Sequence, residues 1–147
     1  MREKEEFIRH FREVQPKFSR FYARLLLRAD LNLSQFALLS LLAGLRRASM
    51  TEAGRELHVS KPAVTNLADR LEASGLVKRT PHPSDRRIFL LSIQPRGERT
   101  VRKMQSEALG FLLKAFNKLT ASERRTITRF YSLLSKTMDE VLQKNKK

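Results

Sequence analysis

The side chains best suited to bind another molecule lie close together between residues 60 and 66. Hydroxyl, ammonium and amide groups gather there, on Ser60, Lys61, Thr65 and Asn66. Small side chains let a backbone approach the edges of nucleotide bases, and hydroxyls and amides can donate or accept hydrogen bonds at those edges. If this stretch is helical, it is suited to lie in a groove of double-stranded DNA.

The same stretch carries the signals of a helix. Ser60 can cap the N-terminus with its hydroxyl, and Pro62, just inside the first turn, gives up no hydrogen bond that the helix needs. Apolar residues then recur at helical spacing and form one face, made of Val64, Leu67, Ala68 and Leu71. Gly75 can adopt the left-handed conformation that ends many helices. We therefore predict a helix that packs one face and presents the other to solvent.

A small basic hairpin is expected to follow this helix. Two strand-like runs, 76–80 and 87–92, are joined by a turn of proline, serine and aspartate. The end of this turn carries Asp85, Arg86 and Arg87. A narrow minor groove concentrates negative potential and attracts an inserted guanidinium. One interpretation is that one arginine enters that groove while Asp85 holds the other in place; the alternative is a solvated, charged turn.

A helix, a stop and a charged hairpin together predict a winged helix-turn-helix, and four motifs in this order are similar to those of the MarR family of transcriptional regulators. Residues 59–65 (VSKPAVT) and 71–77 (LEASGLV) resemble the family's recognition helix. Residues 83–87 (PSDRR) resemble its wing signature, and residues 95–97 (PRG) resemble the start of the helix after the wing. The similarity is sharpest over residues 57–97, and the helical pattern on either side fits the family to both ends.

The resemblance implies a mainly α fold with a small β-hairpin wing, a winged helix-turn-helix with N- and C-terminal dimerisation helices. It implies one domain over residues 1–147, with dimerisation helices in 1–30 and 118–147, a DNA-binding lobe in 33–92 and a connecting helix in 95–117. Two recognition helices related by the dimer axis would enter successive major grooves about one helical turn apart, so the DNA site should be an inverted repeat. The family also implies a repressor released by a small, often anionic aromatic effector, while a regulator without an effector remains open.

Both elements supply candidate DNA contacts. Those expected on the recognition helix are Ser60, Lys61, Pro62, Ala63, Thr65, Asn66 and Arg70. Those expected on the wing are Lys78, Arg79, Asp85, Arg86 and Arg87. Arg70, Lys78 and Arg79 are expected to touch phosphates and set the register on the duplex, although Lys78 and Arg79 also fit a solvated strand edge. By resemblance Arg86 is the inserted arginine and Arg87 pairs with Asp85, but the residues themselves leave the two roles interchangeable.

The chain before this region predicts two helices. Residues 3–27 carry a phenylalanine-rich stripe at helical spacing, interrupted or kinked near Pro16. Such a stripe is typical of packing or of a subunit interface. Residues 33–45, with Ser34 as a possible cap, are apolar on more than one side, as expected for a central helix.

Two capping boxes mark further helix starts. Ser49 and Glu52 open a short helix to about residue 58, and Thr120 and Glu123 open the last helix. Gly54 costs the short helix about 1 kcal/mol relative to alanine, and no sequence pattern explains its presence. A further amphipathic helix is expected over residues 95–117, and the lysine-rich end, 144–147, is expected to fray.

Composition narrows the class of protein. The formal charge of +15 and the sequence pI near 11.1 favour polyanionic partners. The charge does not locate the site, because acidic and basic residues nearly offset each other over 49–92 and the surplus lies in 96–147. No cysteine is present, which excludes disulfides and thiol redox sensing. A mixed-charge N-terminus and the lack of a run of about eighteen apolar residues predict a cytoplasmic protein with no membrane partner.

The sequence offers no catalytic set. His10, His58 and His82 lie on separate predicted elements, and no glycine-rich phosphate loop is present. We therefore expect neither an enzyme nor a metal or cofactor site. The favoured hypothesis is a homodimeric, sequence-specific regulator of transcription that binds double-stranded DNA. The alternative is an architectural DNA- or RNA-binding protein that uses its positive field without regard to sequence, which would give steep salt dependence and no base preference.

Overall fold

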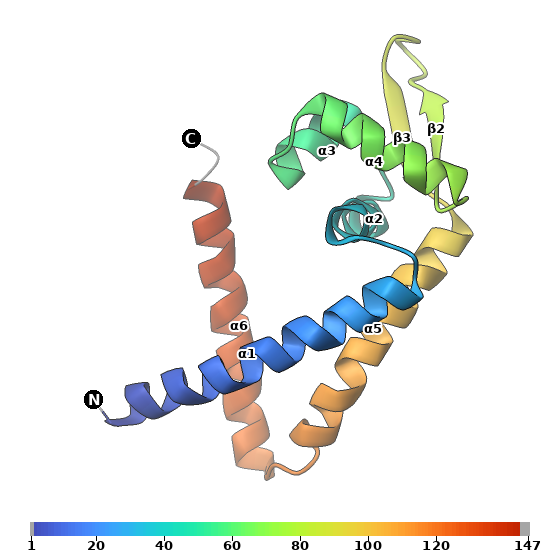
Figure 1. Ribbon diagram of the computed structural model, residues 1–147. Coiled ribbons are helices and arrows are strands. Elements are labelled where there is room, and N and C mark those ends of the chain that lie inside the picture. The colour runs from blue at the N-terminus through green and yellow to red at the C-terminus, as the bar shows by residue number, and fades with distance from the viewer. Residues whose placement is uncertain (1, 145–147) are drawn as a thin grey trace. The chain divides into compact units, whose positions relative to one another are not determined.

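The computed structural model describes residues 2–144. Residue 1 and residues 145–147 lie outside the described part of the chain, and with them most of the tail for which we expect fraying. The elements in chain order are α1 (Arg2–Arg28), α2 (Leu33–Leu45), β1 (Arg47–Ser49), α3 (Met50–Leu57), α4 (Lys61–Ala73), β2 (Val77–Pro81), β3 (Phe89–Ile93), α5 (Pro95–Phe116) and α6 (Ala121–Lys144) (Figure 1). They fall into two compact units, Met1–Ser106 and Glu107–Lys147.

The core of the first unit lies between α2, α4 and the sheet. Leu38, Leu39 and Leu42 of α2 are completely buried, as predicted for a central helix. Helix α4 buries Val64 and Leu71, along with Ala68 between them, and its opposite face is left to solvent. Burying a valine or leucine side chain contributes about 1.5–3 kcal/mol. The predicted apolar face is therefore confirmed, and it fixes which side of α4 points outward.

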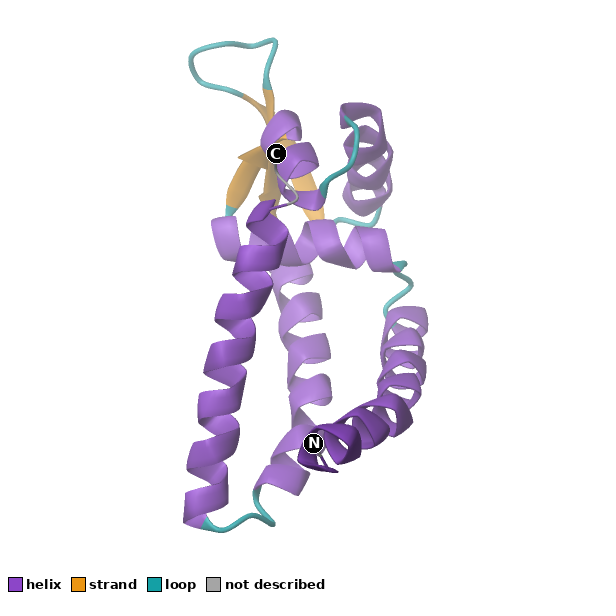
Figure 2. Ribbon diagram, turned by 90° about the vertical axis from the view of Figure 1, so that its left-hand side faces the viewer, coloured by secondary structure: helices purple, strands orange, loops and turns teal. Residues whose placement is uncertain are grey.

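The wing projects from a small antiparallel sheet. Strands β2 and β3 pair from Val77 opposite Ile93 to Pro81 opposite Phe89, which places both strands one or two residues later than predicted. The loop of residues 82–88 extends beyond them (Figure 2). A third strand, β1, pairs with the other side of β3 and was not predicted. Its three residues carry no periodic pattern of their own, and pairing with β3 creates the strand.

Most helix ends follow the predicted signals. In the first capping box, Glu52 N–H donates to Ser49 Oγ at 3.1 Å and Ser49 N–H donates to Glu52 Oε2 at 2.7 Å. In the second, Thr120 N–H donates to Glu123 Oε2 at 2.7 Å, and both boxes are confirmed. Gly75 adopts φ 67°, as predicted for the residue that follows α4.

Two helix features differ in part or in full from their predictions. The cap of α2 is Asn32, not Ser34: the Asn32 side chain accepts from Gln35 N–H at 2.8 Å, and the Gln35 side chain accepts in return from Asn32 N–H. The second difference concerns α1, which runs through Pro16, so the interruption that we allowed for is absent, although the helix bends along its length (Figure 2). Proline removes only the hydrogen bond to the carbonyl of Arg12, and both residues are exposed, so that carbonyl is open to solvent.

Gly54 allows the helix-turn-helix to close. A Cβ at this position would lie 2.9 Å from the carbonyl oxygen of Val59 and 3.5 Å from Cγ2 of Val64. The turn folds back onto this glycine, because Val59 N–H donates to the Gly54 carbonyl at 3.0 Å. The absence of a side chain thus lets the turn and α4 approach α3 closely, which the sequence did not reveal.

Large apolar side chains remain exposed outside the lobe. On α1 they include Phe7, Phe11, Val14 and Tyr22. In the second unit they follow the end of α5 and one side of α6: Leu109, Leu113, Ile127, Phe130, Leu133, Leu134, Met138, Val141 and Leu142. Within residues 2–144 no single helix is long and apolar enough to cross a membrane; α1 and α2 reach that threshold only together, and the chain bends by 81° between them.

Replacing Gly54 with alanine should destabilise the protein by about 1–3 kcal/mol, because the new methyl group meets backbone that cannot move away. The matched control is Gly44→Ala in α2, where a Cβ would meet nothing within 4 Å. Its effect should be neutral or slightly stabilising. Urea unfolding at one fixed protein concentration measures both changes. Equal midpoints for the two variants would contradict the role assigned to Gly54.

Candidate nucleic-acid interface

The first turn of α4 is held by Ser60. Its Oγ accepts a hydrogen bond from Ala63 N–H at 3.3 Å, and Pro62 occupies the first turn, so the predicted cap is confirmed. Because Oγ acts only as an acceptor in this cap, the hydroxyl hydrogen of Ser60 stays available to an external acceptor. A DNA phosphate or a base edge is such an acceptor.

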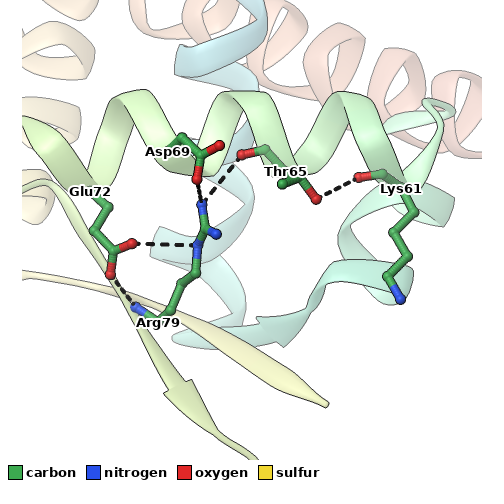
Figure 3. Close-up of polar contacts among 5 residues, drawn as sticks. All are labelled: Lys61, Thr65, Asp69, Glu72 and Arg79. Carbon is green, nitrogen blue, oxygen red and sulfur yellow. Dashed lines mark hydrogen bonds and ion pairs between the residues drawn. The ribbon is translucent and has the colours of Figure 1, made fainter. Parts of the chain in front are cut away.

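The outward face of α4 carries most of the predicted contact residues. Lys61, Pro62, Asn66 and Arg70 are exposed. Ala63 is half-buried and so is Thr65, whose Oγ1 donates to the Lys61 carbonyl at 3.1 Å (Figure 3). The Thr65 hydroxyl therefore uses its donor inside the helix and can offer only its remaining lone pairs to a partner.

The wing loop is organised by its backbone. His82 N–H donates to the Ile88 carbonyl at 2.8 Å and Ile88 N–H donates to the Asp85 carbonyl at 3.0 Å. Asp85 Oδ1 accepts from the backbone N–H of Arg87 at 3.0 Å. The Asp85 carboxylate therefore contacts the backbone amide of Arg87, whereas we expected it to pair with the Arg87 guanidinium. Within residues 2–144 neither Arg86 nor Arg87 forms an ion pair, and both are exposed.

The side chain of Arg79 does not point to solvent, as a phosphate contact or a solvated strand edge would require. Its side chain is only 22% exposed, and it faces α4 instead of solvent. The Nη2 atom forms an ion pair with Asp69 Oδ1 and donates to the Thr65 carbonyl at 3.4 Å, while Nε lies 3.4 Å from Glu72 Oε2 (Figure 3). The backbone N–H of Arg79 also donates to Glu72 Oε1, at 2.9 Å. Its guanidinium is therefore directed toward α4, whereas we expected it to contact a DNA phosphate; the phosphate contact itself stays a prediction.

The two acidic residues of α4 could have indicated from the sequence that a cation lies beside this helix. Asp69 and Glu72 are three residues apart on a helix that is otherwise suited to an anion. Carboxylates on such a surface repel phosphates unless a cation neutralises them. Arg79 is that cation, and strand β2 brings it alongside. Lys78, the preceding residue of the same strand, is exposed, as a phosphate contact requires.

An open depression of about 520 Å³ lies on the surface of the first unit beside the last turns of α4. It is lined by residues from the end of α1 and the start of α2, and by Arg70, Ala73 and Ser74 on the α4 side. Arg70 is therefore a candidate DNA contact that also borders a space large enough for a small molecule. Within residues 2–144 no group of three or more potential metal ligands gathers.

Together, a capped helix with an exposed polar face and a neighbouring wing with arginines near its tip define a winged helix-turn-helix of the DNA-binding class. Residues 29–88 match the model of the MarR family. The uncharacterized HTH-type transcriptional regulator YsmB of Bacillus subtilis is 28% identical over 110 residues, which are 75% of this chain and 73% of YsmB. The HTH-type transcriptional repressor IacR of Pseudomonas putida is 22% identical over 121 residues, 82% of this chain and 72% of IacR.

Solved structures show the same fold. The transcriptional regulator Tm0710 of Thermotoga maritima superposes with a TM-score of 0.71 at 27% identity, covering 95% of this chain and 98% of that one. A variant of S. aureus MepR bound to an oligodeoxyribonucleotide gives a TM-score of 0.72 at 17% identity, covering 90% and 97% of the two chains. In the region of residues 29–88 the protein is therefore similar to the MarR family of winged helix-turn-helix transcriptional regulators.

The capping box of α3 should make the stability of the lobe depend on acidity. Hydrogen bonds from Ser49 hold the pKa of Glu52 below its usual value of 4.5. A lowered carboxylate pKa contributes stability that is present above the usual pKa and is lost as the pH falls through the folded-state pKa. We expect Glu52→Gln to lower the unfolding midpoint at pH 7, and the difference from wild type to shrink below about pH 4.5.

Urea unfolding at several pH values tests this prediction, with Glu140→Gln, on the exposed surface of α6, as the control. The control should show no such convergence at acidic pH. A difference between Glu52→Gln and wild type that stays constant from neutral to acidic pH would contradict the proposed contribution of the capping box.

Proposed function

We propose that this protein is a homodimeric, sequence-specific repressor that binds an inverted repeat in double-stranded DNA. The observation that carries the proposal is the pairing of two exposed elements on one lobe. The outer face of α4 presents small polar and basic side chains, and the adjacent wing presents two exposed arginines. The first suits the major groove and the second suits a narrow minor groove.

The contacts divide by chemistry. Ser60, Lys61 and Asn66, near the start of α4, reach base edges, since the N-terminal residues of a recognition helix usually do so. Arg70 and Lys78 bind phosphates and set the register. In the wing, Arg86 enters the minor groove. The MepR variant bound to an oligodeoxyribonucleotide supports DNA as the partner. Its 17% identity to this chain is evidence of a shared fold.

The exposed apolar side chains support a homodimer. They form stripes on α1, at the end of α5 and along α6, and exposed apolar side chains grouped in this way are typical of an interaction surface. A second copy covering the same stripes would form a two-fold interface, and two recognition helices would then read half-sites about one helical turn apart.

The proposed regulatory mode is repression, with release by an effector. The relative IacR is a transcriptional repressor. The candidate site for a small molecule is the open 520 Å³ depression lined by Arg70 and Asp30. A ligand that prefers a state with the wrong spacing of the two recognition helices would weaken DNA binding by its difference in affinity for the two states.

Selection of bound duplexes from a random DNA pool tests the proposal. We expect an inverted repeat with half-sites about one turn apart. Asn66→Ala should relax the preference at particular positions, at a cost of about 1–3 kcal/mol for the preferred site. Arg86→Ala should weaken binding while leaving the dimer intact, because Arg86 belongs to none of the apolar stripes. Titration of the selected duplex by fluorescence anisotropy measures both effects.

The same experiment separates the alternative function. A wild-type protein that recovers no motif, yet binds DNA or RNA with a steep dependence on salt, would be a sequence-indifferent nucleic-acid-binding protein. Variants at Asn66 and Arg86 that leave the selected motif and its affinity unchanged would show that the assigned interface is wrong.

The dimer is tested on α6. Leu134→Glu introduces a charge into the proposed apolar interface and should convert the dimer to a monomer, or raise its dissociation constant at least about tenfold. Ser132→Glu, an exposed polar position two residues away, should have little effect. Sedimentation equilibrium measures the mass of both variants. A wild-type protein that sediments as a monomer would contradict the homodimer.

A further inference from the structure

We propose that Arg79 is a positioning residue that sets the orientation of the wing relative to the recognition helix, and thereby determines the base preference at the outer ends of each half-site. This inference rests on the proposed function, because it concerns how one lobe reads two grooves together. Arg79 itself does not touch DNA in this account. It acts through Asp69 and Glu72 on one side and through the wing on the other.

The geometry is that of a clamp along one stripe of α4. Thr65, Asp69 and Glu72 are spaced by four and three residues, so they lie one above the other on the helix surface. The guanidinium of Arg79 reaches all three, at the Thr65 carbonyl and at both carboxylates (Figure 3). A planar guanidinium with several donors in fixed directions holds a more defined geometry than a lysine ammonium would.

The clamp also includes the backbone of β2. In the order β1-β3-β2 this strand is an edge strand, so some of its N–H groups have no neighbouring strand. The N–H of Arg79 is bound instead by Glu72 Oε1 at 2.9 Å. The strand is therefore attached to α4 both by a main-chain bond and by a side chain at the same residue. Arg79 precedes the end of β2 at Pro81 by two residues, and the wing loop follows at once.

The same contacts explain the presence of acid on this surface. Asp69 is 56% exposed, on the helix that would lie in the groove. Alone, its carboxylate would repel phosphates, whereas paired with Arg79 it is neutralised and holds the strand in place. Asp69 and Glu72 thus attach the wing to α4 and are not DNA contacts.

The test compares two neighbouring substitutions of the same kind in full-length protein. Arg79→Gln removes the clamp, and Lys78→Gln, the adjacent position, removes one exposed cation from the same strand. Each variant is used in the selection from a random DNA pool and in titrations of the wild-type operator at several salt concentrations. Binding to a scrambled duplex supplies the non-specific affinity.

The two variants should change different properties: Lys78→Gln the salt dependence of binding, and Arg79→Gln the base preference. Lys78→Gln should lower the slope of log affinity against log salt concentration by about 0.9 for each phosphate that the variant no longer neutralises, with the selected motif unchanged. Arg79→Gln should leave the salt dependence and the non-specific affinity unchanged, weaken operator binding about tenfold, and erase base preference at the outer positions that the wing reads. Preference at the inner positions, which α4 reads, should persist.

A double-mutant cycle gives a second readout. If Arg79 orients the wing, Arg86→Ala should cost much less affinity in the Arg79→Gln background than in wild type, because the wing is already misplaced. Should Arg79→Gln fail to fold, as judged by circular dichroism, Asp69→Asn takes its place. That variant keeps both contacts between Arg79 and Glu72. It should weaken the base preference at the outer positions of each half-site less than Arg79→Gln does.

The outcomes separate this inference from the proposed function. A wild-type protein that selects no motif refutes both. If wild type selects a motif, the proposed function stands and two results for Arg79→Gln would overturn only the inference about Arg79. The variant could keep the base preference at the outer positions, or it could lower the salt dependence of binding as Lys78→Gln does. An Asp69→Asn protein that binds the operator more tightly, with its full motif, would also overturn it, since Asp69 would then act only by repulsion.

Discussion

The structure of the DNA-binding lobe depends on the burial of one face of α4. An isolated helix of 13 residues is marginal in water, so its stability comes from tertiary packing. Val64, Ala68 and Leu71 supply that packing against α2 and the neighbouring elements of the lobe, and all three are completely buried. Because the two faces of a helix are fixed relative to each other, burying this one commits Lys61 and Asn66 to solvent. The reading surface is therefore a direct consequence of the core.

The wing needs a different kind of support. A two-stranded hairpin is marginally stable alone, and here β3 gains a second neighbour in β1 while β2 is bound to α4. The polar clamp at Arg79 occupies the edge of the sheet, where an unpaired strand would otherwise expose free backbone groups. Apolar burial thus orients the recognition helix, and charged hydrogen bonds orient the wing beside it.

Net charge plays a more general part in this protein. The charge of +15 attracts any polyanion and speeds the encounter with DNA, but it carries no sequence information. Within the lobe, acidic residues offset much of the positive charge, and two of them are used to hold Arg79. Under the proposed function, specific reading must therefore come from the shape of the lobe and the placement of a few donors and acceptors.

Local patterns in the chain were enough to predict the extent of α4, its buried and exposed faces, both capping boxes and the position of the wing. These features rest on contacts between residues a few positions apart, such as Ser49 with Glu52, and so leave a readable spacing. Long-range packing, in contrast, makes β1 a strand, folds the turn onto Gly54 and directs Arg79 toward α4. Each of these depends on groups from separate segments; the pairing of Ala48 with Leu91, for example, spans most of the lobe. No local pattern records which strand will lie beside which helix, because that choice is made by the packing of the whole lobe.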